Sequence, residues 1–163
     1  MEAHNSILGI SLGTRQIGIA LCTGGQLYEW QVKTFTGKWS KSKLRGILLT
    51  LSGIIDEERV GQVAVKIPDI IPASKGFTQL MGGLNVLCEQ KHFKARYYTL
   101  SDIKKQFAPD KELNKETLAE IIVACHPELQ HAYRKQKKRK NAYYYKLFEA
   151  VAAAHLLYVT TTS

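Results

Sequence analysis

The stretch that decides the fold is ILGISLGTRQIGIAL, residues 7–21. Two apolar segments rich in isoleucine, 7–10 and 17–21, lie on either side of a Leu-Gly-Thr turn. Branched side chains favour extended backbone, and Gly13 permits a tight turn between the two segments. The pattern therefore predicts a β-hairpin that begins a sheet, with Ser11 at the end of its first strand.

The length and composition indicate one ordinary domain, residues 1–163, with a hydrophobic core. No apolar run is long enough to span a bilayer, and the first residues lack a signal-peptide pattern. We therefore expect a cytoplasmic protein with no membrane partner. The cysteines are odd in number, far apart and set in apolar segments, which predicts buried free thiols. They are Cys22, Cys88 and Cys125.

The positive charge is concentrated in one segment. The net charge is +9, and residues 133–146 contain seven basic residues and no acid, so the rest of the chain carries only +2. Such a density attracts phosphate backbones, and we predict nucleic-acid binding by a basic loop, about 131–141, before the last helix. The alternative is a solvated loop that only aids solubility. The residues predicted to bind are Arg134, Lys135, Lys137, Lys138, Arg139 and Lys140.

Hydrophobic spacing predicts the remaining elements. The later strands are expected at 27–35, 62–67 and 95–99. Helices are expected to begin at Ser40, Ser74, Ser101, Asn114 and Asn141. The Gly82-Gly83 pair weakens the second helix or marks the close approach of another backbone. The helix that Asn114 caps turns four residues inward, namely Leu118, Ile121, Ile122 and Cys125.

The order of these elements predicts the fold class. Three antiparallel strands come first, helices and strands then alternate, and a helix ends the chain. This order implies an α/β protein with a mixed five-stranded sheet, in which three antiparallel strands are followed by parallel strands and helices cover both faces.

The opening hairpin is similar to that of RuvC-type Holliday junction resolvases and of the related YqgF family. Four later pieces resemble segments of these proteins in the same order, namely VAVKIP, YYTLSDIKKQF, ELNKETLAEIIVAC and NAYYYKLFEAVAAAHLL. The resemblance covers about residues 6–158 and implies the ribonuclease H-like fold. Actin-like ATPases share the Gly-Thr turn, but they need a second domain, for which this chain has no room.

The resemblance also implies where a metal site would lie. Resolvases of this fold hydrolyse a phosphodiester with two divalent metals, which four carboxylates hold. Here the first-strand position is Ser11 and the fourth-strand position is Lys66. The last helix supplies Lys146 and Glu149, or Tyr145 in the other alignment register. Since at most one carboxylate remains, we expect no metal and no catalytic residue of this kind.

Several alternatives concern the same site. Lys66 is expected to act as a fixed charge, neutralising phosphate or pairing with Glu149. Asp69 and Asp102 could complete a rearranged site, although a strand end and a first helical turn explain both more simply. Ser11 has no visible histidine and acid to make it a nucleophile. His126 and His131 are separated by Pro127 and share no helical face, so we expect no metal there.

Three hypotheses on function follow. The first is a catalytically inactive RuvC-like protein, a pseudoenzyme, that binds branched or double-stranded nucleic acid, with DNA expected. The second is a metal-dependent junction-resolving nuclease with a rearranged site, the one case that requires Mg²⁺. The third is a structural or interaction module in which the basic loop is incidental and the cleft binds a partner other than nucleic acid. Nucleic acid would then bind only at low salt and without regard to shape. By analogy with the two-fold resolvases we expect a homodimer. Residues expected to assist the first function are Lys38, Lys41, Lys43, Arg45, Tyr143, Tyr144 and Tyr145.

Overall fold

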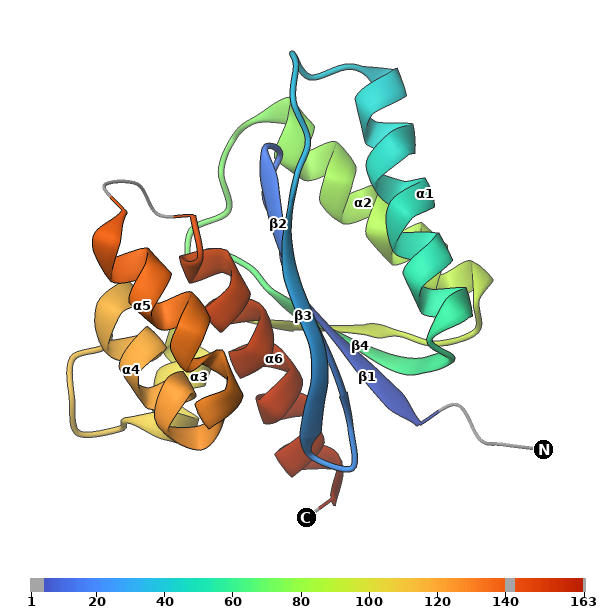
Figure 1. The fold of residues 1–163 in the computed structure, drawn as a ribbon. Coiled ribbons are helices and arrows are strands. Elements are labelled where there is room, and N and C mark those ends of the chain that lie inside the picture. The colour runs from blue at the N-terminus through green and yellow to red at the C-terminus, as the bar shows by residue number, and fades with distance from the viewer. Residues whose placement is uncertain (1–4, 140–142, 163) are drawn as a thin grey trace.

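The computed structural model describes residues 5–139 and 143–162, which form a five-stranded sheet with helices on both faces (Figure 1). The strand order is β3-β2-β1-β4-β5, with β1, β2 and β3 antiparallel and β4 and β5 joining in parallel. The predicted mixed sheet is therefore confirmed. The strands are β1 (Ser6–Ser11), β2 (Gln16–Thr23), β3 (Gln26–Thr34), β4 (Val60–Lys66) and β5 (Ala95–Tyr98).

The helices divide into two groups, one for each face of the sheet (Figure 1). One face carries α1 (Lys41–Glu57) and α2 (Lys75–Gln90). The other carries α6 and the helices packed against it, namely α3 (Leu100–Phe107), α4 (Lys115–Cys125), the short 3₁₀ helix η1 (Pro127–Leu129), α5 (Gln130–Lys138) and α6 (Tyr145–Thr162). Among the described residues, no helix has the length and hydrophobicity needed to cross a bilayer.

The hydrophobic core lies in layers above and below the sheet. Ile10 of β1 packs with Leu51 of α1 and Leu84 of α2 on one face, and all three are fully buried. Phe148 of α6 and Ile122 of α4 belong to the cluster on the other face and are buried to the same degree. Burial on both faces explains why the central strands are almost uniformly apolar.

Helix α6 packs unusually close to the hairpin that opens the fold. A Cβ atom added at Gly9 would collide with the carbonyl oxygen of Ala150, and one at Gly18 with that of Lys146. These two glycines therefore allow the last helix to touch the first two strands. The Gly82-Gly83 pair has no such role, because the close neighbour of Gly83 is the Leu48 side chain of α1 rather than another backbone.

The prediction of the cap of α3 was wrong by two residues. Thr99, and not Ser101, caps this helix, because its hydroxyl accepts from the Asp102 amide while the Asp102 carboxylate accepts from the Thr99 amide. This reciprocal pair is a capping box. It confirms Asp102 as a first-turn acid, and Ser101 instead donates to Asp69.

The predicted basic loop is mainly a helix, α5. Ala132 and Gln136 lie one turn apart and are both buried, so the segment has an inner face that its charge density obscures in the sequence. The last helix begins at Tyr145 in the structure. Asn141, where we expected it to begin, lies outside the described residues, as does Lys140.

Two of the three cysteines agree with the sequence prediction. Cys22 and Cys88 are buried free thiols, and burial raises the pKa of each to about 11. The prediction for Cys125 was wrong, because this residue is exposed. It is the last residue of α4, just before the chain turns into η1, where Leu129 is fully buried.

Candidate functional site

The candidate site lies at one end of the sheet, where the last residues of β1 and β4 meet helix α6. Ser11 and Lys66 are the last residues of β1 and β4 and are directly paired in the parallel register. Glu149 reaches the same point from the second turn of α6, whose close packing on the hairpin makes this possible. The structure thus brings together three side chains that are distant in sequence.

Glu149 is the centre of this cluster. One carboxylate oxygen, Oε1, accepts a hydrogen bond from the Ser11 hydroxyl at 3.0 Å, and Oε2 lies 2.7 Å from the Lys66 ammonium nitrogen. Ser11 is fully buried, and Glu149 is only 4% exposed. The expected pairing of Lys66 with Glu149 is therefore confirmed. A buried carboxylate needs such partners, because an unpaired charge is costly away from water.

Lys146 adds a second cation beside the cluster. It lies one turn before Glu149 on α6, and its ammonium group donates to the Leu12 carbonyl oxygen at 2.8 Å. Burial lowers the pKa of Lys146, and nearby Lys66 and Lys115 lower it further, whereas Glu149 opposes the shift. The cluster therefore holds two ammonium groups and one carboxylate.

Tyr145, the other candidate position on the last helix, does not join the cluster. It is half-buried against the core under α4, and burial together with nearby Glu116 raises its pKa. Of the two registers that the sequence left open, the structure directs Lys146 and Glu149 toward the ends of β1 and β4.

The side chains around Glu149 do not supply the ligands that a pair of hard divalent cations needs. Such ions need several carboxylate oxygens, and here the single carboxylate is neutralised by Lys66. Asp69 accepts from Ser101, and Asp102 belongs to the capping box of α3, so each carboxylate has another role. No group of three or more His, Cys, Asp or Glu side chains that could hold a metal occurs among residues 5–139 and 143–162.

A pair of histidines lies away from the Glu149 cluster, among the helices that pack against α6. Nε2 of His126 lies 3.3 Å from Nδ1 of His155 on α6, and the His155 ring packs against Phe107 of α3. Burial lowers the pKa of both histidines. No local sequence pattern indicates this pairing, since the partners are far apart along the chain. His131, the partner considered from the sequence, is exposed on α5.

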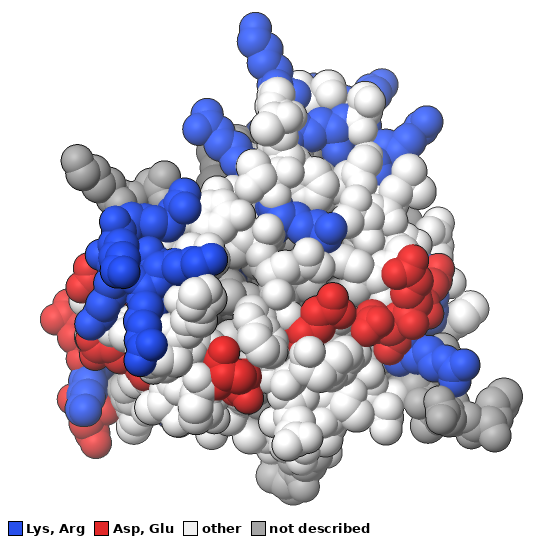
Figure 2. All heavy atoms as spheres, viewed as in Figure 1, with Lys and Arg blue, Asp and Glu red and all other residues white. Residues whose placement is uncertain are grey.

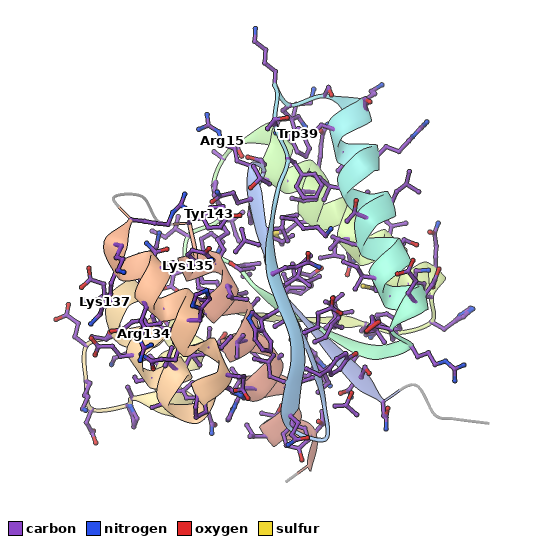
Figure 3. All side chains as sticks on the ribbon, in the orientation of Figure 1. Arg15, Trp39, Arg134, Lys135, Lys137 and Tyr143 are labelled. Carbon is purple, nitrogen blue, oxygen red and sulfur yellow. The ribbon has the colours of Figure 1, made fainter. Side chains whose placement is uncertain are left out.

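The outer side of α5 and the residue after it carry a dense group of cations, which we call the basic surface. Figure 2 shows these side chains gathered over α5, and Figure 3 shows Arg134, Lys135 and Lys137 projecting from that helix. All are exposed, and no acidic residue interrupts them along the chain. The described residues of the basic surface are Arg134, Lys135, Lys137, Lys138 and Arg139.

Aromatic rings connect the basic surface to the start of α6. The Arg139 guanidinium lies 4.4 Å from the centre of the Tyr143 ring, and Tyr143 packs edge to face against Tyr144. Tyr144 and Tyr145 contact the core, as expected for at least one of the three tyrosines. Lys146 follows Tyr145 directly in the chain. These tyrosines therefore link the end of α5 to the start of the helix that carries Glu149.

A second basic region lies at the start of α1, at the upper edge of Figure 2. Lys38, Lys41 and Arg45 are exposed there, whereas Lys43 donates to the Gly37 carbonyl. Trp39 is packed on Gly76, and its indole N–H donates to Gln79 at 2.8 Å, so this ring joins α1 to α2.

No protein-family model and no curated protein sequence matches this chain. Among solved structures, the chain is similar to Thermus thermophilus RuvC in complex with a Holliday junction substrate. The TM-score is 0.72 with 15% identity, over 98% of this chain and 96% of that one. A further Thermus thermophilus RuvC structure gives a TM-score of 0.70 and 15% identity, with 96% of each chain covered. This similarity establishes the RuvC-like, ribonuclease H-like fold that the sequence predicted.

Proposed function

We propose that this protein binds nucleic acid, with branched or double-stranded DNA as the expected ligand, and does not hydrolyse it. The fold is that of RuvC, and one similar RuvC structure contains a Holliday junction substrate. In this proposal, the positions that hold metal-binding acids in the resolvases have been replaced by Ser11, Lys66 and Lys146, with Glu149 as the remaining acid.

The observation that carries the proposal is the internal neutralisation of Glu149. Its two oxygens are already occupied by Lys66 at 2.7 Å and Ser11 at 3.0 Å, so the cluster is complete without a cation. A divalent metal would have to displace the Lys66 ammonium group and then lie beside it and Lys146, where like charges repel. Metal-assisted hydrolysis is therefore not expected at this site.

The basic surface supports the binding part of the proposal. Five exposed cations between residues 134 and 139 create a strong local positive potential on α5. Each cation that contacts a phosphate releases counterions, which makes binding strong at low salt and weaker as salt rises. Such contacts hold the backbone without reading base sequence, so shape rather than sequence is expected to select the ligand.

Fluorescence anisotropy with a labelled four-way junction and a matching linear duplex tests the binding. We expect binding in EDTA as well as in Mg²⁺, since the protein needs no metal, with Mg²⁺ weakening it only as a competing counterion. Replacing Arg134, Lys135 and Lys138 together with glutamine is expected to lower the dependence of log affinity on log salt by up to about three units.

A matched control removes the same charge elsewhere. Lys94, Lys105 and Lys111 are exposed and lie outside the basic surface, so their replacement with glutamine is expected to have a smaller effect on that slope. Equal effects of the two triple variants would show that only net charge matters and would contradict the proposed surface. Equal binding of both DNA molecules that occurs only at low salt, or no binding of either, would favour the interaction module.

A further inference from the structure

A small polar cavity lies beside the basic surface, between α4, α5 and the start of α6. Its volume is about 220 Å³. Drug-sized pockets measure roughly 300–1,000 Å³, so this cavity suits a single ring system. The lining residues that matter for its chemistry are Glu116, Glu120, Tyr133, Lys137, Arg139 and Tyr145.

One wall of the cavity is acidic and aromatic. Glu116 and Glu120 lie one turn apart on α4 and therefore share a helical face. The Tyr133 hydroxyl donates to Glu120 at 3.4 Å, and the charge of Glu116 contributes to the raised pKa of Tyr145, after the larger effect of burial. Within the described part of the chain, neither glutamate forms an ion pair.

The other wall is cationic and belongs to the basic surface. The Lys137 ammonium nitrogen lies 4.8 Å from the centre of the Tyr133 ring, and Arg139 follows at the end of α5. Lys137 and Arg139 thus line the cavity while remaining exposed to an incoming phosphate. A ligand of this cavity therefore needs hydrogen-bond donors at one end and negative charge at the other.

An unpaired nucleotide meets both requirements. Carboxylates only accept hydrogen bonds, and the phosphates of nucleic acid offer no donor, so the glutamates must be matched by base N–H groups. Guanine presents two adjacent donors, N1–H and N2–H, on its Watson–Crick edge, which matches a carboxylate. That edge is free only when the base is unpaired, and extruded bases are commonly bound between aromatic side chains in this way.

We propose that this cavity binds one unpaired guanine of the nucleic acid held on the basic surface. The glutamates accept from the Watson–Crick edge of the base, and Lys137 and Arg139 hold its phosphate. This inference rests on the proposed nucleic-acid binding. It adds a preference for a duplex that contains an unpaired guanine.

Three duplexes of the same length test the inference by anisotropy: fully paired, with one bulged guanine, and with one bulged inosine, which lacks the N2 amino group. We expect the protein to bind the bulged guanine about tenfold more tightly than the paired duplex, as for a hydrogen bond to a charged group. The inosine duplex is expected to lose most of this gain.

Two variants test whether the cavity causes the preference for bulged guanine. Glu120→Gln keeps the shape of the side chain and is expected to abolish the preference while leaving affinity for the paired duplex unchanged or slightly higher. Glu112→Gln removes an equal charge from an exposed acid that does not line the cavity, and is expected to keep the preference. Both positions are exposed, so circular dichroism is expected to show unchanged folding.

The two proposals fail in different ways. Equal affinity for the paired and bulged duplexes, with both still bound, would overturn the guanine site and leave nucleic-acid binding intact. Equal preference for bulged guanine and bulged inosine, or an unchanged preference in Glu120→Gln, would also overturn it. Absence of binding to all three duplexes would contradict the proposed function and the inference that rests on it.

Discussion

Lys66 and Glu149 differ from an ordinary surface ion pair because their side chains are only 13% and 6% exposed. Removing one member of such a pair leaves the other charge with little water to solvate it. Removing only one of the two residues is therefore expected to destabilise the protein more than removing both.

We expect Lys66→Met to lower the free energy of unfolding by about 3 kcal/mol at neutral pH, because Glu149 is left without its counter-charge. The double variant Lys66→Met/Glu149→Leu is expected to lose less, since neither charge remains. Urea denaturation measures both values.

The exposed ion pair of the same length supplies the control. Lys91 and Asp56 also lie 2.7 Å apart, but Asp56 is 66% exposed, so solvent screens the pair. Lys91→Met is expected to change the free energy of unfolding by less than about 1 kcal/mol. A loss in Lys91→Met as large as that in Lys66→Met would contradict the special status of the buried pair.

The histidine pair makes stability depend on pH. Burial lowers the pKa of His126 and His155 from their usual value of 6.5, so near that pH the unfolded chain binds protons that the folded chain does not. The free energy of unfolding is expected to fall as the pH drops below about 6.5 and to stop falling below the lowered pKa values.

This contribution is measured by urea denaturation at about pH 7.5 and about pH 5.5, on either side of the usual histidine pKa. His155→Gln is expected to reduce the difference in unfolding free energy between the two conditions. His131→Gln, on the exposed side of α5, is the control and is expected to leave that difference unchanged. The same pH dependence in all three proteins would rule out the pair as its source.

Helix α6 depends on the glycines of the opening hairpin. Gly9→Ala would place a methyl group against the Ala150 carbonyl oxygen, which no side-chain rotation can relieve. We expect this substitution to lower the free energy of unfolding by about 3 kcal/mol, as in an overpacked core. It should also shift Glu149, one residue away from that carbonyl, relative to Ser11.

Gly46 of α1 is the matched control, because nothing lies within 4 Å of a Cβ atom added there. Gly46→Ala is expected to raise the free energy of unfolding by about 0.5–1 kcal/mol, since alanine favours a helix interior. Thermal denaturation of the two variants checks these opposite signs, and destabilisation of similar size in both would contradict the packing of α6 on the hairpin.

Elements with a strong hydrophobic period could be predicted from the sequence. The strands of the hairpin and the spacing of Leu44, Ile47 and Leu51 in α1 follow directly from it. The basic segment was predicted to be a loop because only Ala132 and Gln136 face inward in α5. Two buried positions are too few to give a helical hydrophobic period. The TLSD capping box at Thr99 was present in the sequence, and a search for that spacing would have found it.

The site could be predicted only in part. The resemblance selected Ser11, Lys66 and Glu149, and the structure brings these residues together. The pairing of His126 with His155 and the cavity beside Glu120 depend on how α4, α5 and α6 pack. Contacts between helices distant in sequence leave no local pattern, so they could not be predicted.

Across the whole molecule, the Glu149 cluster and the basic surface lie close together on a RuvC-like fold. The tyrosines before α6 connect them, with Arg139 over the Tyr143 ring and Lys146 just beyond. The cluster contributes two ammonium groups and one buried ion pair. Under the proposed function, nucleic acid would lie across this region and its phosphodiester backbone would stay uncut.

Binding without cleavage is tested directly on a four-way junction. A four-way junction labelled at one end is incubated with saturating protein in Mg²⁺ or Mn²⁺, and the strands are separated on a denaturing gel over time. We expect the junction to be bound and all strands to remain full length with either metal. Metal-dependent cuts that disappear in Glu149→Gln would contradict it and would establish a nuclease.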